Sequence, residues 1–513
     1  MAKQDVAAGD MLHGFRVERV EALPELRAQA SMLRHAKSGA RLLHLLSDDP
    51  ENLFAIALRT PPPDDTGLPH ILEHTVLCGS RRYPVKDPFV ELLRCSLATF
   101  LNAMTYPDKT VYPCASMVER DFFNLAGVYC DAVFHPLLTE NHFRQEGHHL
   151  DFAEPGNPAS PLVVKGIVYN EMKGAYSDLD GTIDRWLAKS VCPGTAYGRD
   201  SGGDPDAIPG LSYADFTAFH RRYYHPSNSF IFAYGNLPLS RHCAFLDPVL
   251  SEFDAAEIDT SIASQPRWIE PVRRTIAYPI PENEASAAKA AVTVSFLAND
   301  ATDGIRTLAM HLLDSYLLGH AGAPLRKALI DSKLGEELTH SGYQDYQRDT
   351  TFTIGLKGCD PRHATDIEEL TLNTLRKLSR EGFNKARMES SFHQLELASR
   401  EISGQFPLRL MDRAYRCWLY DSDPLRHLRL GEHLAELRRR WETEPRFLEK
   451  ILEESAASNP HYSVLTFVPD ASLAARCETE FSKRMAAVKA GLSPHELLAV
   501  EKEARELEEM QSC

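Results

Sequence analysis

The sequence predicts an α+β fold made of two duplicated domains. The chain has 513 residues. A single hydrophobic core usually stops growing at about 250–300 residues, so more than one domain is expected. Strand patterns and helix patterns alternate through the first half of the chain, and the same order of patterns returns in the second half. The repetition lies in the order of the elements more than in residue identity, so it indicates an internal duplication.

The first domain, expected over residues 1–255, begins with strands and a helix. The apolar runs 40–47 and 52–60 predict a hairpin of strands. A helix is expected between Gly67 and Gly79, because a proline suits its first turn and a glycine suits its end.

Two helices, a pair of short strands and a long helical region follow. Residues 88–96 begin with a proline and predict a helix. Residues 99–116 contain a Pro-Asp turn between two short strands. Apolar residues at helical spacing predict a helix over 119–136, and residues 161–191 are expected to form a long helical region that begins near Val163.

A glycine-rich loop, a helix and a strand complete the first domain. The loop 201–205 (SGGDP) lacks the lysine of a phosphate-binding loop, so we expect it to be structural or to line a chamber. Ser212 is the expected N-cap of the next helix, and residues 228–237 predict a strand. Residues 256–281 have little periodicity and several prolines, which is typical of a linker.

The second domain, expected over residues 282–480, repeats this order of elements. The patterns predict a strand over 289–300, helices over 303–319 and 323–330, and a strand over 350–358. This copy is expected to be non-catalytic, since its first helix contains a histidine and an aspartate but no complete set of metal ligands.

The charged run 481–513 is expected to be a helix, and Ser493 within it resembles an N-cap. It resembles the first arm of a longer hairpin between two halves of a larger molecule. A frayed C-terminal helix is the alternative.

Composition restricts the function classes. With 43% hydrophobic and 25% charged residues, the chain has the composition of an ordinary globular protein. A net charge of −16 disfavours nucleic acid and anionic membrane surfaces, and it fits a cavity that attracts basic ligands. No apolar window is long enough to predict a membrane-spanning helix.

The cysteines and the first residues favour a cytoplasmic location. The ten cysteines are scattered without a C-x-x-C pair, which is typical of reduced thiols in a cytosol-like compartment. Residues 1–20 show neither the apolar core of a secretory signal nor the arginine-rich, acid-poor pattern of a transit peptide.

The segment HILEH, residues 70–74, is the strongest functional signal. In a helix, residues three and four apart share a face, so His70, Glu73 and His74 are expected to lie together. Two imidazoles one turn apart can bind one Zn²⁺, and a glutamate between them can take a proton from a zinc-bound water. The alternative is an exposed helix face that happens to contain these residues.

A catalytic zinc site with two histidines needs a third protein ligand. Spacing does not select one of the glutamates that the first domain offers. The candidates are Glu91, Glu119, Glu140, Glu146, Glu154 and Glu171.

Six segments together resemble the pitrilysin-type zinc metallopeptidases, or inverzincins, and among them the presequence protease and falcilysin group. The segments are GLPHILEHTVLCGSRRYP, FLNAMTYPDKTVYP, FRQEGHHLDF, KGIVYNEMKGAYSD, SGGDPDAIPGLS and YYHPSNSFIFAYGN. The resemblance covers essentially the whole chain but only the amino-terminal half of such an enzyme. It implies two pitrilysin-like domains, each a mainly antiparallel sheet packed with helices on one side.

The resemblance also implies a set of site residues. His70, His74 and Glu171 are expected to bind one Zn²⁺, and Glu73 to act as the general base. We expect Glu171 to be carried toward a core by the apolar residues before it, where a metal would compensate its charge. Asn102 and Ala103 are expected on an edge strand that binds the substrate as an added strand.

The implied function is hydrolysis of short unstructured peptides by a zinc endopeptidase. The acidic balance favours basic peptides, and a complementary carboxy-terminal half or partner subunit is expected to be needed for full activity. No nucleic-acid or membrane partner is expected. The alternative is a non-catalytic scaffold or partner subunit of a pitrilysin-type complex, although such subunits lose motif residues that are all present here.

Overall fold

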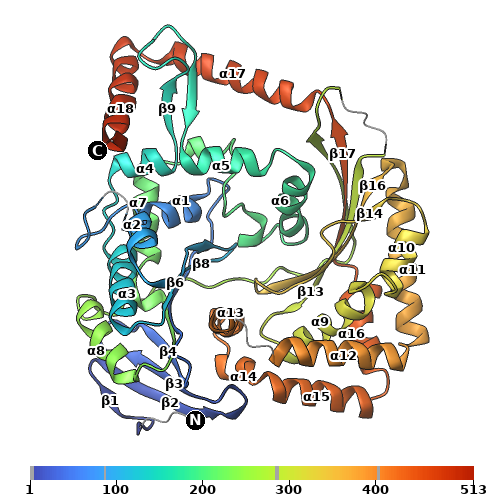
Figure 1. Cartoon of the computed structure of the whole chain (residues 1–513). Coiled ribbons are helices and arrows are strands. Elements are labelled where there is room, and N and C mark those ends of the chain that lie inside the picture. The colour runs from blue at the N-terminus through green and yellow to red at the C-terminus, as the bar shows by residue number, and fades with distance from the viewer. Residues whose placement is uncertain (1–4, 86–87, 284–287, 401–404, 513) are drawn as a thin grey trace.

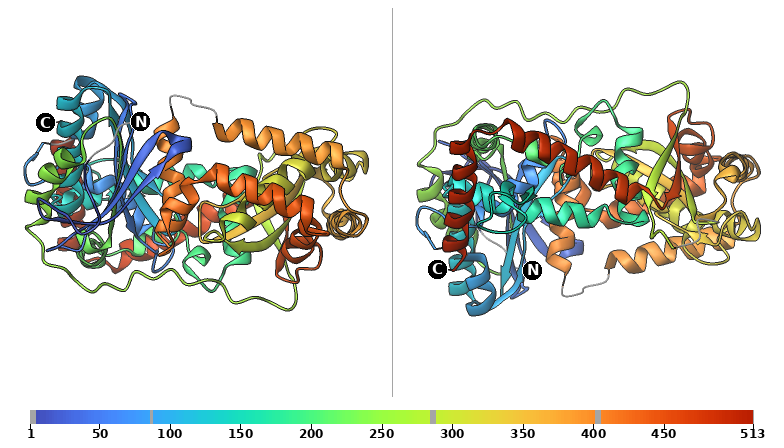
Figure 2. Two further views of the ribbon diagram at one scale, coloured as in Figure 1. Left: turned by 90° about the horizontal axis from the view of Figure 1, so that it is seen from below. Right: turned by 90° about the horizontal axis from the view of Figure 1, so that it is seen from above.

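The computed structural model describes residues 5–85, 88–283, 288–400 and 405–512. They form an α+β fold with two lobes, each built around its own sheet (Figure 1). Residues 254–271 form neither helix nor strand, and Figure 2 shows this segment running along the outside of the molecule from one lobe to the other.

The first lobe contains a mixed sheet with the strand order β1-β2-β3-β4-β11-β5-β8-β6, and β7 also pairs with β8. Only β4 and β11 are parallel neighbours among the strands described for this sheet. The strands are β1 Met11–Leu12, β2 Phe15–Leu23, β3 Ala28–His35, β4 Arg41–Leu46, β5 Asn52–Arg59, β6 Ala98–Leu101, β7 Met104–Thr105, β8 Lys109–Ser116 and β11 Ser229–Gly235.

The expected hairpin of residues 40–47 and 52–60 is wrong. Both segments are strands, β4 and β5, but β11 lies between them and pairs with each. The pairing partner comes from far along the chain, and short-range turn signals carry no information about such an insertion.

Helices of the first lobe cover one face of its sheet. Buried side chains of α1, α3, α7 and α8 join those of the strands in one core, including Ile71, Phe122, Phe216 and Leu246. As expected, Ser212 caps α7, where its hydroxyl accepts a hydrogen bond from the backbone of Asp215. The helices of this part of the chain are α1 Leu68–Val76, α2 Pro88–Cys95, α3 Glu119–Phe134, α4 Glu140–Glu146, α5 Ile167–Ala175, α6 Leu179–Val191, α7 Tyr213–Tyr223 and α8 Leu239–Leu250.

The single long helical region expected over 161–191 is also wrong. Residues 162–165 form a strand, β10 (Leu162–Lys165), which pairs with β9 (His149–Phe152), and two separate helices follow. Gly166 separates β10 from α5 with a backbone φ of 156°. A short apolar run before a helix has no periodicity that distinguishes it from a first helical turn.

The second lobe repeats the plan with the strand order β12-β17-β13-β16-β14, and β15 also pairs with β16. Its strands are β12 Val272–Pro279, β13 Ala290–Asp300, β14 Glu337–Leu338, β15 Gly342–Gln344, β16 Asp349–Cys359 and β17 Tyr462–Asp470. Its helices are α9 Gly304–Leu318, α10 Pro324–Asp331, α11 Ala364–Glu381, α12 Lys385–Arg400, α13 Phe406–Trp418, α14 Pro424–Leu428, α15 Leu430–Thr443 and α16 Phe447–Leu452. The elements expected in this half are present. The expected linker is too long, because β12 occupies part of it and pairs with the distant β17.

The other face of each sheet is covered by a helix from the opposite half of the chain. Leu410, Met411 and Tyr415 of α13 pack against the first sheet, where the Tyr415 hydroxyl donates to the Phe230 carbonyl at 2.9 Å. Ile183 and Leu187 of α6 pack against the second sheet. Each lobe thus contributes a helix that covers the remaining face of the other lobe's sheet.

Two helices, rather than the one expected over 481–513, end the described chain. They are α17 Leu473–Gly491 and α18 Pro494–Ser512. Ser493 caps α18 through a reciprocal pair: its backbone N–H donates to Glu496, and its hydroxyl accepts from the Glu496 backbone. Helix α17 spans the two lobes on one side of the molecule (Figures 1 and 2).

Candidate metal centre

Helix α1 carries His70, Glu73 and His74 on one face. Its opposite side is anchored by Ile71 and Leu72, which are fully buried in the first core. The helix begins after Gly67, whose φ is 68°. A side chain at Gly67 would lie 2.6 Å from the carbonyl oxygen of Gly202, so the start of α1 requires glycine there.

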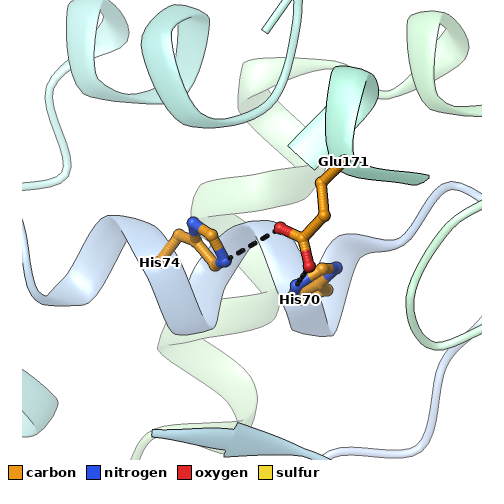
Figure 3. Close-up of side chains that lie close together, drawn as sticks. All are labelled: His70, His74 and Glu171. Carbon is orange, nitrogen blue, oxygen red and sulfur yellow. Dashed lines mark ion pairs between the residues drawn. The ribbon is translucent and has the colours of Figure 1, made fainter. Parts of the chain in front are cut away.

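Glu171 on α5 lies opposite the two histidines (Figure 3). Its carboxylate oxygens are 3.8 Å from His70 Nε2 and 3.7 Å from His74 Nε2. Within the described residues, these three form the only group of at least three His, Cys, Asp or Glu side chains whose ligand atoms all lie within 4.8 Å of one another. The structure thus brings together the distant glutamate that the resemblance implied.

The physical reason expected for Glu171 is wrong. Its side chain is 52% exposed, so the carboxylate is not carried into a core and is not forced by burial to find a partner. Helix α5 places the carboxylate on its side facing α1 (Figure 3). Its relation to the histidines comes from the packing of α4 and β10 around α5.

Acceptors behind the two imidazoles orient them. His70 Nδ1 lies 3.0 Å from the carbonyl oxygen of Gly202, and His74 Nδ1 lies 3.2 Å from Glu146 Oε2. A carbonyl can only accept, so His70 carries its proton on Nδ1. Glu146 fixes the same tautomer at His74, so both Nε2 lone pairs face the space beside the Glu171 carboxylate, where a metal would bind. Gly202 belongs to the glycine-rich loop 201–205, which thus contacts the ring of His70.

Against the effect of its burial, three carboxylates raise the pKa of His74. Burial by itself would lower the pKa of His74, but the hydrogen bond with Glu146 and the charges of Glu73, Glu146 and Glu171 outweigh it and raise that pKa. Burial by itself would raise the pKa of Glu146, and hydrogen bonds from His74 and Gln145 lower it instead. Glu146 is thus held as an anion behind His74.

The donor set fits a zinc ion. Two imidazole nitrogens, one carboxylate and an open fourth position are the ligands of many catalytic zinc sites. Tetrahedral ligands about 2.0–2.1 Å from zinc lie about 3.3 Å from each other. The nitrogen–oxygen separations of 3.8 and 3.7 Å are close to that value.

Glu73 has a partner that sequence reasoning missed. The hydroxyl of Thr105 on β7 donates to Glu73 Oε2 at 2.7 Å. Glu146 was among the glutamates left open as a third ligand, and the structure places it behind His74 instead. Residue spacing could not predict the contact of Thr105 with Glu73 or that of Glu146 with His74, because each contact joins α1 to an element distant in the sequence.

Asn102 and Ala103 were expected on an edge strand, but they lie between β6 and β7, next to the sheet edge formed by β6. The backbone groups of Asn102 are already used: its N–H donates to the Pro113 carbonyl at 3.2 Å, and its carbonyl accepts from the Tyr129 hydroxyl at 3.1 Å. The side chain of Asn102 is exposed. At this position the side chain, rather than the main chain, is available to a ligand.

Comparison with known proteins gives consistent results. Residues 210–395 match the family model described as the peptidase M16 inactive domain. The chain is 40% identical over 466 residues to the mitochondrial presequence protease of Mus musculus, a match that covers 90% of this chain and 45% of that protein. It is 39% identical over 504 residues to presequence protease 1 of Arabidopsis thaliana, a match that covers 96% of this chain and 46% of that protein. It is 38% identical over 509 residues to protein HypA of Clostridium perfringens, a match that covers 97% of this chain and 51% of that protein. The chain spans about half the length of these curated relatives.

Solved structures share the fold at low sequence identity. A protease from Helicobacter pylori superposes with a TM-score of 0.68 at 14% identity, covering 86% of this chain and 100% of that chain. A peptidase M16 inactive domain from Pseudomonas fluorescens superposes with a TM-score of 0.66 at 15% identity, covering 86% of this chain and 98% of that chain. These likenesses confirm the two-lobed α+β architecture.

The cytoplasmic location expected from the sequence is contradicted. The matching presequence proteases of Mus musculus and Xenopus laevis are named as mitochondrial, and that of Arabidopsis thaliana as chloroplastic and mitochondrial. The expectation depended on scattered cysteines and on the absence of a recognisable targeting pattern, and neither observation identifies a compartment. None of the helices in the described residues is both long and apolar enough to cross a membrane.

Proposed function

We propose that this chain, a relative of the presequence proteases with the fold of M16 peptidases, is the zinc-binding half of an endopeptidase that hydrolyses short unstructured peptides. The observation that carries the proposal is the convergence of His70, His74 and Glu171 within 4.8 Å. The matched M16 inactive-domain model begins at residue 210, beyond all three of these residues, so it does not describe this cluster.

The chain's own residues have separate roles in this reaction. His70, His74 and Glu171 hold the metal, which when bound polarises a carbonyl and lowers the pKa of its bound water toward about 7. Glu73 lies on the same face of α1 and accepts the proton of the attacking water, then delivers it to the leaving amine.

The edge of the first sheet is the proposed substrate-binding surface. A peptide added beside β6 would be held by main-chain hydrogen bonds, which are common to every sequence and explain tolerance for many substrates. In this arrangement Asn102 supplies its exposed side chain and Ala103 a small one. The net charge of −16 favours basic peptides.

Full activity is proposed to need a complementary carboxy-terminal half, in the same or a partner chain. The support is that the relatives are about twice as long as the matched region. We place contact with that half at α17 and α18. Among the described residues of α17 only Met485 is buried, so most of the surface of this helix is open to a partner.

Metal content and peptide cleavage test the proposal together. We expect the purified chain to bind one Zn²⁺ and to cleave an unstructured basic peptide, most rapidly with the complementary half supplied. Glu73→Gln is expected to keep its zinc and to lose activity by about 10²- to 10⁴-fold. Glu171→Gln is expected to lose zinc, whereas Glu119→Gln, which removes an exposed carboxylate paired with Arg241, should behave as the unmodified chain. A metal-free and inactive unmodified chain would favour the non-catalytic scaffold.

A further inference from the structure

The hydroxyl of Thr105 is the hydrogen-bond donor that the described structure provides to Glu73. Thr105 Oγ1 donates to Glu73 Oε2 at 2.7 Å. We propose that Thr105 is a positioning residue that holds the Glu73 carboxylate by one oxygen and leaves the other to receive a proton. The proposal rests on the general-base role of Glu73 proposed above.

The two oxygens of the Glu73 carboxylate have different surroundings. Among the described residues no hydrogen bond to Glu73 Oε1 accompanies the one at Oε2. A glutamate side chain has several rotatable bonds, and an unrestrained one spends little time in the orientation needed for proton transfer. One hydrogen bond at Oε2 restricts those rotations without occupying Oε1. A donor at each oxygen would instead reduce the basicity of both.

Thr105 is itself held on a rigid support. It pairs with Thr110 in the β7–β8 ladder, and the turn between these strands is anchored by the buried side chain of Asp108. That carboxylate accepts hydrogen bonds from the hydroxyls of Tyr197 at 2.6 Å and Tyr420 at 2.7 Å.

Tyr420 follows α13 and comes from the opposite half of the chain. In the chain, Asn102 and Ala103, the proposed substrate-binding residues, come immediately before β7 and this anchored turn. One short segment therefore carries both the hydroxyl that holds the base and the residues of the proposed substrate edge.

Two substitutions at position 105 separate positioning from packing. Thr105→Val keeps the shape of the side chain and removes the hydroxyl, whereas Thr105→Ser keeps the hydroxyl and removes a methyl group. We expect Thr105→Val to lower kcat by about 10- to 100-fold, with KM and zinc content unchanged. Thr105→Ser is expected to retain most of kcat. A purely structural role predicts instead that Thr105→Ser is at least as damaging as Thr105→Val.

A matched control excludes a general effect of losing a threonine hydroxyl. Thr302 in the second lobe also donates its hydroxyl to a carboxylate at 2.7 Å, that of Asp300. Thr302→Val is expected to leave kcat unchanged.

Crystal structures of the zinc-loaded variants test the contact without requiring activity. We expect Glu73 to be ordered as in the unmodified chain in Thr105→Ser and to adopt several orientations in Thr105→Val. An unchanged, ordered Glu73 in Thr105→Val, or an unchanged kcat, overturns the positioning role. If the unmodified chain and Glu73→Gln cleave peptide equally, the proposed function fails instead, and the order of Glu73 still decides whether Thr105 positions it.

Discussion

At the scale of single residues, the candidate metal centre depends on side chains that do not face the metal position. Glu146 is buried and lies 3.2 Å from His74 Nδ1. A carboxylate in this position fixes the protonated nitrogen of the ring and increases the electron-pair donation of the other. The affinity for zinc should therefore depend on a residue that does not touch it.

Glu146→Gln is expected to weaken zinc binding by about 10- to 100-fold, because an amide is neutral and a weaker acceptor for the imidazole N–H. Competition with a chromophoric chelator measures the dissociation constant. Glu140→Gln changes an exposed carboxylate on the same helix, paired with Arg144, and should leave the constant unaltered. Equal constants for the two variants would exclude a role for Glu146 in the metal site.

Sequence reasoning at this scale succeeds where the geometry is local. The common face of His70, Glu73 and His74 follows from helix periodicity alone, and all three residues lie within α1. The third ligand could not be chosen by spacing, and Glu171 came from the family resemblance. Glu146 and Thr105 were missed in their roles because tertiary packing, which no spacing records, brings them to α1.

At the scale of elements, the junction between β10 and α5 decides where Glu171 lies. Gly166 has a φ of 156°, and a Cβ at this position would lie 2.1 Å from the carbonyl oxygen of Gly147. The backbone of β10 thus approaches the end of α4 more closely than any side chain permits. The sequence pattern showed the apolar residues here but not the close approach.

Gly166→Ala is expected to lower the free energy of unfolding by about 1–3 kcal/mol and to weaken zinc binding, because the backbone must move and α5 moves with it. Denaturant unfolding and chelator competition measure the two effects. Gly174→Ala in the same helix meets no atom within 4 Å and should be neutral or slightly stabilising. A Gly166→Ala protein as stable as the unmodified chain would contradict the close approach.

At the scale of the whole molecule, the fold exchanges helices between its lobes. All eight residues of β5 are buried, with Phe54 and Ile56 in the core under the first lobe's helices and Ala55 in the core with α13. Burial of both faces explains why this strand is a continuous apolar run instead of an alternating one. The run predicted a strand correctly, but it could not identify α13 as the cover.

Leu410→Ala removes a fully buried side chain of α13 from this interface. It is expected to lower the free energy of unfolding by about 2–5 kcal/mol and to increase hydrogen exchange in β4, β5 and β11 of the first lobe. Leu397→Ala changes a leucine that is 71% exposed on α12 and should stay within about 0.5 kcal/mol of the unmodified chain. Faster exchange confined to the second lobe would show that α13 does not stabilise the first sheet.

The order of elements and the duplication could be predicted because the elements are local patterns, and several of them recur in the same order in the second half. The insertion of β11, the pairing of β12 with β17 and the exchanged helices depend on contacts between distant segments, which a single sequence does not record.

The most direct measurement of the central claim is anomalous diffraction at the zinc absorption edge from crystals of the chain grown with Zn²⁺. The account predicts one strong peak enclosed by His70 Nε2, His74 Nε2 and a carboxylate oxygen of Glu171. A peak elsewhere, or none at this position while the side chains are ordered, would contradict it.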